Sequence, residues 1–199
     1  MQTISALFLD RDGTMIHDSP DSITMLDQVR LIERADDALA LAKQAGFKLI
    51  MISNQGGIAK GIVTKARVDE INAYLQSLLA PKHATLDLIY YAPFHPKYPH
   101  AEYDALAHWR KPDTGMIQQA MHDLASQGFT VEVARSFFIG DKQIDVECGL
   151  RAGLRPILVK TGYGEVEKCR EKNTLPEFIA HDLYDAVASY ILNHMNHKS

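Results

Sequence analysis

With 199 residues, the chain is long enough for one well-buried core, and we expect a single domain over residues 1–199. Its 46% hydrophobic and 23% charged residues are ordinary for a globular protein, and its net charge of −4 argues against nucleic acid as a main partner. No apolar run approaches the roughly 18 residues that span a membrane, none resembles a signal peptide, and the two cysteines form no metal-binding pair. We therefore expect a cytoplasmic protein with neither membrane nor nucleic-acid partners.

The expected elements follow one another as short apolar runs and amphipathic patterns. In chain order they are a strand over residues 4–9, a helix over 35–45, a strand over 47–52, a helix over 64–79, a strand over 86–91, a helix from 116 to a stop near 128, strands over 137–139 and 156–159, and a closing helix over 183–195. This alternation predicts an α/β fold, a three-layer Rossmann-like sandwich around a central, mostly parallel sheet. Residues 93–110 are predicted to form a long loop, and no insertion is large enough for a separate cap domain.

The first strand ends in two acids one residue apart, Asp10 and Asp12. If the extended backbone continues, residues two apart point to the same side, and two neighbouring carboxylates repel each other unless a cation or a proton lies between them. This arrangement suits a metal-assisted attack on phosphorus. The alternative is an Asp-Gly hairpin turn at Asp12 and Gly13.

Polar residues also follow other expected strands. Ser53 ends the second strand, Asp141 follows the fourth, and Lys111 closes the long loop. Because ligands of open parallel sheets bind at the carboxyl ends of the strands, we expect these side chains to meet Asp10 and Asp12 there and to form a Mg²⁺ and phosphate site. Taken singly, the serine could be a helix cap, the lysine a solvated surface residue, and the third aspartate an N-cap.

Four motifs resemble those of the haloacid dehalogenase superfamily of phosphohydrolases. They are FLDRDGT at residues 8–14, ISNQ at 52–55, Arg-Lys-Pro at 110–112 and GDKQID at 140–145. Within the superfamily, NQGGIAKG at 54–61 and RKPDTGMI at 110–117 are most similar to D,D-heptose-1,7-bisphosphate 7-phosphatases, with histidinol-phosphate phosphatases as close relatives. The similarity extends over nearly the whole chain.

The resemblance implies a mechanism through an aspartyl-phosphate. Asp10 would be the nucleophile, and Asp12 would act as general acid and then as general base. Mg²⁺ would be held by the carboxylates of Asp10 and Asp141 and by the backbone carbonyl of Asp12. Ser53 and Lys111 would bind the phosphoryl oxygens.

The remaining motif residues would bind substrate or support the site. Asn54 would contribute to the substrate pocket, and Arg110 would bind a second phosphate, unless it pairs with an acid. Gly13 would permit the sharp turn after the acids, and Thr14 would bond to nearby backbone. Asp145 would orient the metal's waters or Lys142.

The chain departs from the heptose phosphatase pattern in one respect. Many members carry a zinc loop of the form Cys-x-His and Cys-x-Cys, and the matching positions here are Ala92, Phe94, Ala107 and Trp109. Zinc is therefore not expected, and apolar packing of the two aromatic residues is expected to hold the loop instead. The histidines of this loop, His95, His100 and His108, fit no usual set of metal ligands.

The expected function is that of a Mg²⁺-dependent phosphatase that removes the 7-phosphate of D-glycero-D-manno-heptose 1,7-bisphosphate. Histidinol phosphate or another small sugar phosphate is the alternative substrate, and a degenerate phosphate-binding module is the non-enzymatic alternative. A receiver module is disfavoured because the third strand ends in Tyr90-Tyr91-Ala92, and a nucleotide-binding oxidoreductase because the first turn lacks G-x-G-x-x-G. The sequence does not distinguish a monomer from an oligomer.

Overall fold

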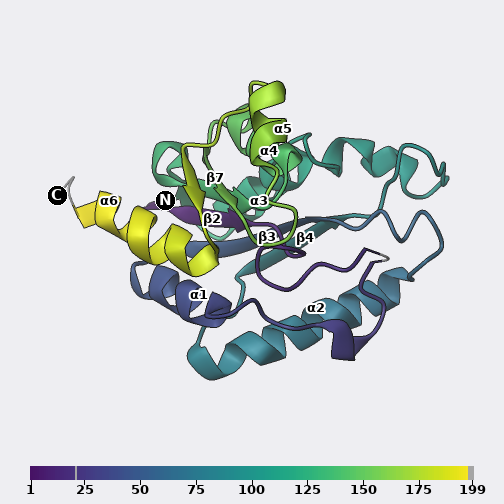
Figure 1. The fold of residues 1–199 in the computed structure, drawn as a ribbon, viewed down its shortest axis with the longest axis horizontal. Helices are drawn as coiled ribbons and strands as arrows, with labels where there is room; N and C mark the ends of the chain where they lie inside the picture. The colour runs from purple at the N-terminus through teal and green to yellow at the C-terminus, as the bar shows by residue number, and fades with distance from the viewer. Residues whose placement is uncertain (21, 197–199) are drawn as a thin grey trace.

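The computed structural model describes residues 1–20 and 22–196, and it has the expected three-layer α/β fold (Figure 1). The central sheet has six parallel strands in the order β4-β3-β2-β6-β7-β8. These strands are β2 (Ala6–Leu9), β3 (Lys48–Asn54), β4 (Leu88–Ala92), β6 (Phe137–Gly140), β7 (Arg155–Val159) and β8 (Phe178–Ala180). A second, two-stranded parallel sheet pairs β1 (Gln2–Ile4) with β5 (Phe129–Val131).

Helices cover both faces of the central sheet (Figure 1). One face packs against α1 (Ala35–Gln44), α2 (Lys65–Leu79) and the C-terminal helices η5 (Asp185–Ile191) and α6 (Leu192–Asn196), and the other against α3 (Gly115–Ser126) and α4 (Gln143–Arg151). The short helix α5 (Val166–Glu171) packs against α4. Along β2, Leu7 and Leu9 point to the first face and Phe8 to the second, as the period of two in a strand requires. No separate cap domain is present in the described part of the chain.

The predicted helices 35–45 and 64–79 are confirmed, and local signals explain their ends. Helix α1 ends before Gly46, which has a φ of 87° that residues with a side chain rarely adopt. Helix α2 begins after Thr64, whose hydroxyl accepts a hydrogen bond from the backbone N–H of Arg67 at 3.1 Å. The predicted apolar stripe of α2, including Val68, Ile71 and Leu75, is buried.

The strand predicted over residues 4–9 differs from the structure. The chain changes sheets at Ser5, so that β1 pairs with β5 and only β2 enters the central sheet. The sequence also failed to predict β5, β8, α4 and α5, since both strands have only three residues and α4 buries the polar Gln143 and Asp145. The closing helix is present, but residues Asp185–Ile191 are wound as a π-helix.

The long loop over residues 93–110 contains a 3₁₀ helix, η3 (Asp104–Trp109). Trp109 packs edge-on against Tyr90 with ring centroids 6.0 Å apart, and the Tyr90 hydroxyl donates to Asp123 Oδ2 at 2.6 Å. Aromatic packing thus holds the end of the loop at Trp109, one of the two aromatic residues expected to do so, whereas Phe94 makes no ring contact with the described residues. Among the described residues, no helix is both long and apolar enough to cross a lipid bilayer.

Candidate active site

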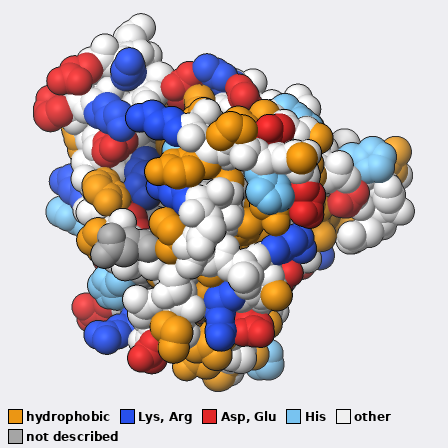
Figure 2. Space-filling view, turned by 90° about the vertical axis from the view of Figure 1, so that its right-hand side faces the viewer, with side chains coloured by type: hydrophobic (Ala, Val, Ile, Leu, Met, Phe, Trp, Pro, Cys, Tyr) orange, Lys and Arg blue, Asp and Glu red, His pale blue; other side chains and the backbone are white. Residues whose placement is uncertain are grey.

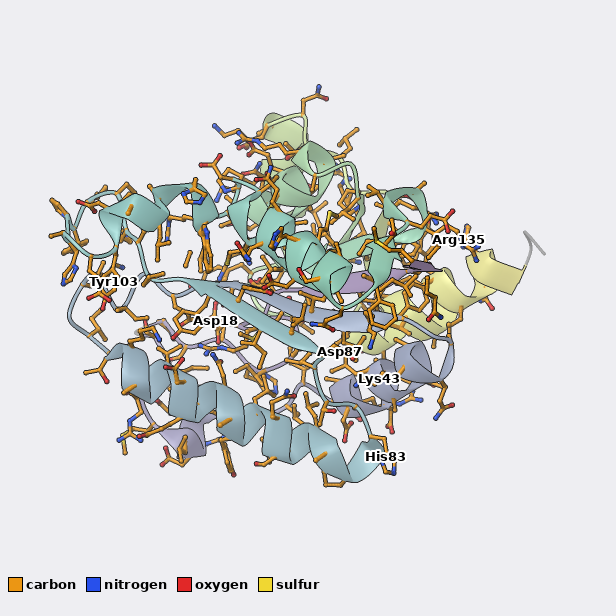
Figure 3. All side chains as sticks on the ribbon, turned by 180° about the vertical axis from the view of Figure 1, so that it is seen from behind. Asp18, Lys43, His83, Asp87, Tyr103 and Arg135 are labelled. Carbon is orange, nitrogen blue, oxygen red and sulfur yellow. The ribbon has the colours of Figure 1, made fainter. Side chains whose placement is uncertain are left out.

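The carboxyl ends of β2, β3 and β6 lie side by side and bring together residues that are far apart in sequence. A cavity of about 250 Å³ opens at this edge, and most of the predicted site residues line it: Asp10, Asp12, Ser53, Asn54, Arg110, Lys111 and Lys142. This edge faces the viewer in Figure 2, where basic, acidic and histidine side chains lie among apolar ones. In Figure 3, Asp18 and Tyr103 lie toward this end of the molecule, whereas His83 and Lys43 lie toward the other.

Three buried carboxylates form the floor of the site. Oxygen atoms of Asp10, Asp141 and Asp145 all lie within 4.8 Å of one another. The ammonium of Lys111, which is 2% exposed, lies 2.9 Å from Asp10 Oδ1 and 2.7 Å from Asp145 Oδ1. The Lys111 ammonium therefore pairs with two of the three buried carboxylates, and the charge of Lys142 also acts on Asp10 and Asp141. The carboxylates of the floor still outnumber these two cations, because Lys142 itself donates to Asp18.

The pKa values of Asp141, Asp145 and Lys111 reflect this excess of negative charge. Burial, and then the charge of Asp10, raises the pKa of Asp141 to about 8, and Asp141 Oδ1 is buried with no hydrogen-bond partner in the described structure. Burial also raises the pKa of Asp145 to about 6, against the opposing effect of Lys111. Burial tends to lower the pKa of Lys111, but Asp10 and Asp145 together raise it above its usual value. A divalent cation bound to oxygen ligands would supply the missing charge.

The side chain of Asp12 is held by residues for which the sequence predicted no role. Arg11 is fully buried, and its Nε and Nη2 donate to the two carboxylate oxygens of Asp12 at 3.0 Å each. Gln55 Nε2 donates to Asp12 Oδ2 at 2.8 Å and to Ser53 Oγ at 2.9 Å. Asn72 of α2 accepts from Arg11 at 2.8 Å. In the sequence, the polar Asn72 among the apolar residues of the buried face of α2 was the feature that could have indicated this network.

Hydrogen bonds hold several supporting residues; Asp145 contacts Lys142 as expected, and the contacts of Asn54 and Thr14 differ from those expected. The side-chain amide of Asn54 accepts from the Lys111 N–H at 3.0 Å and donates to the Lys111 carbonyl at 3.1 Å, so it fixes the backbone of that lysine. Asp145 accepts from the backbone N–H of Lys142 at 3.0 Å, while the Lys142 ammonium donates to Asp18 at the same distance. The hydroxyl of Thr14 is buried and makes no hydrogen bond to the described residues, so the expected bond to the backbone is wrong.

Arg110 is half-buried, and burial lowers its pKa. Its Nη1 donates to the Phe94 carbonyl at 3.0 Å, and no carboxylate in the described part of the chain forms an ion pair with it. The alternative prediction, that Arg110 pairs with an acid, is therefore wrong for the described residues. Arg110 lines the cavity, and no described carboxylate compensates its charge.

Two glycines enclose the carboxylate of Asp141. Gly13 has a φ of 83°, and a Cβ there would lie 2.5 Å from Asp141 Oδ2. A Cβ on Gly162, which has a φ of 63°, would overlap the same oxygen and lie 2.7 Å from Gly13 Cα. The neighbouring Tyr163 N–H donates to Asp141 Oδ2 at 2.8 Å. Only glycine fits both positions without displacing this carboxylate, and the tight turn expected at Gly13 is present without a hairpin.

We expect Gly162→Ala to displace Asp141 and to weaken Mg²⁺-dependent activity. The strained φ and the overlap together should cost about 1–3 kcal/mol of unfolding free energy. Thermal unfolding and the Mg²⁺ concentration that gives half-maximal activity measure the two effects. Gly46→Ala is the matched control, because Gly46 also has a positive φ of 87° but nothing within 4 Å of its Cβ position. Equal Mg²⁺ requirements in both variants would contradict the role of Gly162.

The raised pKa of Asp141 predicts how stability depends on pH without metal. The folded state keeps a proton on this group up to about pH 8, whereas the unfolded state loses it near its ordinary value of 3.8. The contribution of protonated Asp141 to the free energy of unfolding is therefore complete at low pH. It is lost as pH rises, by at most about 1.4 kcal/mol per pH unit. Denaturant unfolding in a chelator from about pH 5 to 8 should show a steeper decline for the wild type than for Asp141→Asn. Equal slopes would contradict this assignment.

Comparisons with known proteins agree with the geometry. Residues 108–186 match the HAD-hydrolase-like family model. The chain is 50% identical to D-glycero-D-manno-heptose-1,7-bisphosphate 7-phosphatase of Chlorobaculum tepidum over 192 residues, 96% of both chains. The chain belongs to this heptose bisphosphate phosphatase family. It is also 33% identical to the D-glycero-beta-D-manno-heptose-1,7-bisphosphate 7-phosphatase of Escherichia coli K12 over 162 residues, 81% of this chain and 82% of that protein.

The fold of this chain is also similar to that of a solved heptose bisphosphate phosphatase structure. The D,D-heptose 1,7-bisphosphate phosphatase of B. bronchiseptica, crystallised with magnesium and phosphate, is 28% identical and superposes with a TM-score of 0.80 over 98% of this chain and 99% of that one. The family membership and the α/β architecture predicted from the sequence are both confirmed. Among the described residues, Asp10, Asp141 and Asp145 form a group of three acidic side chains that could hold a metal ion.

Proposed function

We propose that this protein hydrolyses the 7-phosphate of D-glycero-D-manno-heptose 1,7-bisphosphate. The observation that carries this proposal is the buried group of three carboxylates and one lysine at the carboxyl edge of the sheet, in a chain 50% identical to a phosphatase of that name. The substrate would be a small phosphorylated sugar, and the cavity of about 250 Å³ suits a small metabolite.

The acidic floor fits Mg²⁺. Carboxylate oxygens are hard ligands, Asp141 Oδ1 has no hydrogen-bond partner among the described atoms, and three carboxylates lie close together on the floor. Asp10 and Asp141 would hold the ion, with the backbone carbonyl of Asp12. Bound there, Mg²⁺ would neutralise the negative charge of the carboxylates and of the phosphoryl oxygens.

Asp10 would attack the phosphorus atom. Its Oδ1 lies 2.9 Å from the Lys111 ammonium, and this ion pair fixes the direction of the carboxylate. Attack by the carboxylate forms an aspartyl-phosphate and releases the sugar, and water then hydrolyses this intermediate to regenerate Asp10. Lys111 and Ser53 would bind the phosphoryl oxygens, because phosphoryl transfer depends mainly on positioning and charge neutralisation.

Asp12 would protonate the departing sugar oxygen and later accept a proton from the attacking water. Arg11 and Gln55 hold this carboxylate at the cavity wall through three hydrogen bonds. These bonds fix the position of the carboxylate, which proton transfer in both steps requires.

A substrate panel tests the proposal. Purified protein should release phosphate from the heptose 1,7-bisphosphate with kcat/KM at least about tenfold above that for histidinol phosphate or common sugar monophosphates, and only with Mg²⁺. A higher kcat/KM for histidinol phosphate would overturn the substrate, and no Mg²⁺-dependent phosphate release from any of them would overturn the enzymatic activity. The absence of nucleic-acid and membrane partners, the cytoplasmic location and the absence of zinc stay predictions.

A further inference from the structure

A buried arginine lies against the carboxylate proposed as the general acid. Arg11 is fully buried, and in the described part of the chain its ion pair is with the adjacent Asp12. Its Nε and Nη2 donate to the two oxygens of that carboxylate at 3.0 Å each, so the planar guanidinium holds both oxygens in one orientation. Whatever fixes the guanidinium therefore also fixes the carboxylate.

The third nitrogen of the guanidinium is bound by the side chain of Asn72. Arg11 Nη1 donates to Asn72 Oδ1 at 2.8 Å. Asn72 is 4% exposed, and its amide nitrogen is buried without a hydrogen-bond partner among the described residues. An unsatisfied buried donor lowers stability, so packing alone favours an apolar residue at this position. The contact that this amide does provide is the one from its carbonyl oxygen to Arg11.

Helix α2 holds Asn72 at a fixed place beside the sheet. Val68, Ile71 and Leu75 lie before and after Asn72 on the same helix and are fully buried. Ile71 and Leu75 belong to the main hydrophobic core, together with Leu7 and Leu9 of β2. Because side chains in such a core are closely packed, the amide oxygen has a fixed position relative to the end of β2.

The position of Asp12 matters most when the sugar oxygen leaves. As a carboxylate oxygen of Asp10 bonds to phosphorus, the bond between phosphorus and the sugar oxygen breaks, and its electron pair passes to that oxygen. The proton of Asp12 passes to the same oxygen, so the sugar leaves as an alcohol and Asp12 becomes a carboxylate. Proton transfer needs donor and acceptor about 2.6–3.2 Å apart, so a displaced Asp12 impairs this step more than it impairs substrate binding.

We propose that Asn72 is a positioning residue that acts through Arg11 to hold Asp12 where it protonates the leaving sugar oxygen. This inference rests on the proposed function, in which Asp12 is the general acid. Neither Asn72 nor Arg11 is among the described residues that line the cavity, so the effect reaches the substrate through Asp12. It is confined to leaving groups that need a proton.

Two substrates with different leaving groups test this role. Heptose 1,7-bisphosphate releases a sugar oxygen that needs a proton, whereas p-nitrophenyl phosphate releases a stable phenolate. Both form the same aspartyl-phosphate, and kcat/KM reports the steps up to its formation. In Asn72→Leu, kcat/KM should fall about 10- to 100-fold for the heptose substrate and less than about threefold for the aryl phosphate. Inhibition by inorganic phosphate should stay within about twofold of the wild type.

Arg11→Lys separates orientation from charge. Lysine keeps the positive charge but lacks the planar fork that binds both oxygens of Asp12, so this variant should show the same selective loss. Gln76→Leu is the matched control on α2, because the Gln76 amide binds the backbone of Leu86 at 2.8 and 3.0 Å instead of the guanidinium. It should lower the melting temperature but keep the wild-type ratio of the two kcat/KM values. Thermal unfolding identifies the variants that are folded.

Asp12→Asn calibrates the ratio, because it removes the acid itself and should give the largest selective loss. If this variant changes the ratio while folded Asn72→Leu or Arg11→Lys keeps it, the positioning role is overturned and the proposed function stands. Equal losses for both substrates in Asn72→Leu, or the same selective loss in Gln76→Leu, would also overturn the role. An unchanged ratio in Asp12→Asn would overturn the general acid of the proposed function and this inference with it.

Discussion

Asp10→Asn should lower kcat by about 10⁴-fold or more, because the amide is a poor nucleophile and cannot form the aspartyl-phosphate. The substitution preserves the shape of the side chain, which is 5% exposed and packed at the end of β2. Phosphate release under saturating Mg²⁺ and substrate measures the loss.

Circular dichroism and thermal unfolding separate this loss from misfolding. Asp113→Asn is the matched control, since Asp113 is an exposed aspartate two residues beyond Lys111 that pairs with Arg151 and does not line the cavity. We expect its kcat to stay within about twofold of the wild type. A fully folded Asp10→Asn enzyme with more than about a tenth of wild-type kcat would refute the nucleophile assignment.

Lys111→Met should destabilise the protein by about 3–5 kcal/mol and lower kcat/KM by about 10³-fold. Methionine has a similar length but removes the ammonium that compensates Asp10 and Asp145, leaving buried carboxylates unpaired. The same ammonium would neutralise phosphoryl charge in the transition state. Denaturant unfolding at pH 7 and steady-state kinetics measure the two effects.

A double variant shows whether the lost stability comes from unpaired charge. Adding Asp145→Asn to Lys111→Met removes one of the two carboxylates and should recover part of the unfolding free energy but none of the activity. Lys65→Met is the matched control, because its ion pair with Asp69 at 3.3 Å is exposed and should contribute at most about 1 kcal/mol. If Lys111→Met and Lys65→Met have the same free energy of unfolding, the loss of stability in Lys111→Met does not come from unpaired buried charge.

Where side chains follow strand ends, the sequence predicted correctly which of them would lie together. Asp10, Ser53 and Asp141 end neighbouring parallel strands, and the topology of such a sheet places these ends together whatever the intervening sequence. Lys111 was identified by its motif, and its position between two carboxylates explains why that loop end must be buried.

The sequence could not reveal contacts that depend on three-dimensional neighbours. Arg11 lies between Asp10 and Asp12 in the motif but is itself buried, and its partner Asn72 comes from the middle of α2. Gly162 follows β7 without any motif that links it to Asp141, and its constraint becomes visible only as a close approach of backbone to carboxylate. Strands β5 and β8 have three residues each, too few to show a periodic pattern.

A crystal structure with Mg²⁺ and vanadate tests most directly whether the carboxylates at the sheet edge hold a cation and direct one oxygen at phosphorus. We predict Mg²⁺ bound to Asp10 and Asp141, and vanadium bonded to a carboxylate oxygen of Asp10 with Ser53 and Lys111 at its equatorial oxygens. Vanadium bonded to another side chain, or Mg²⁺ bound away from Asp10 and Asp141, would contradict the proposed mechanism.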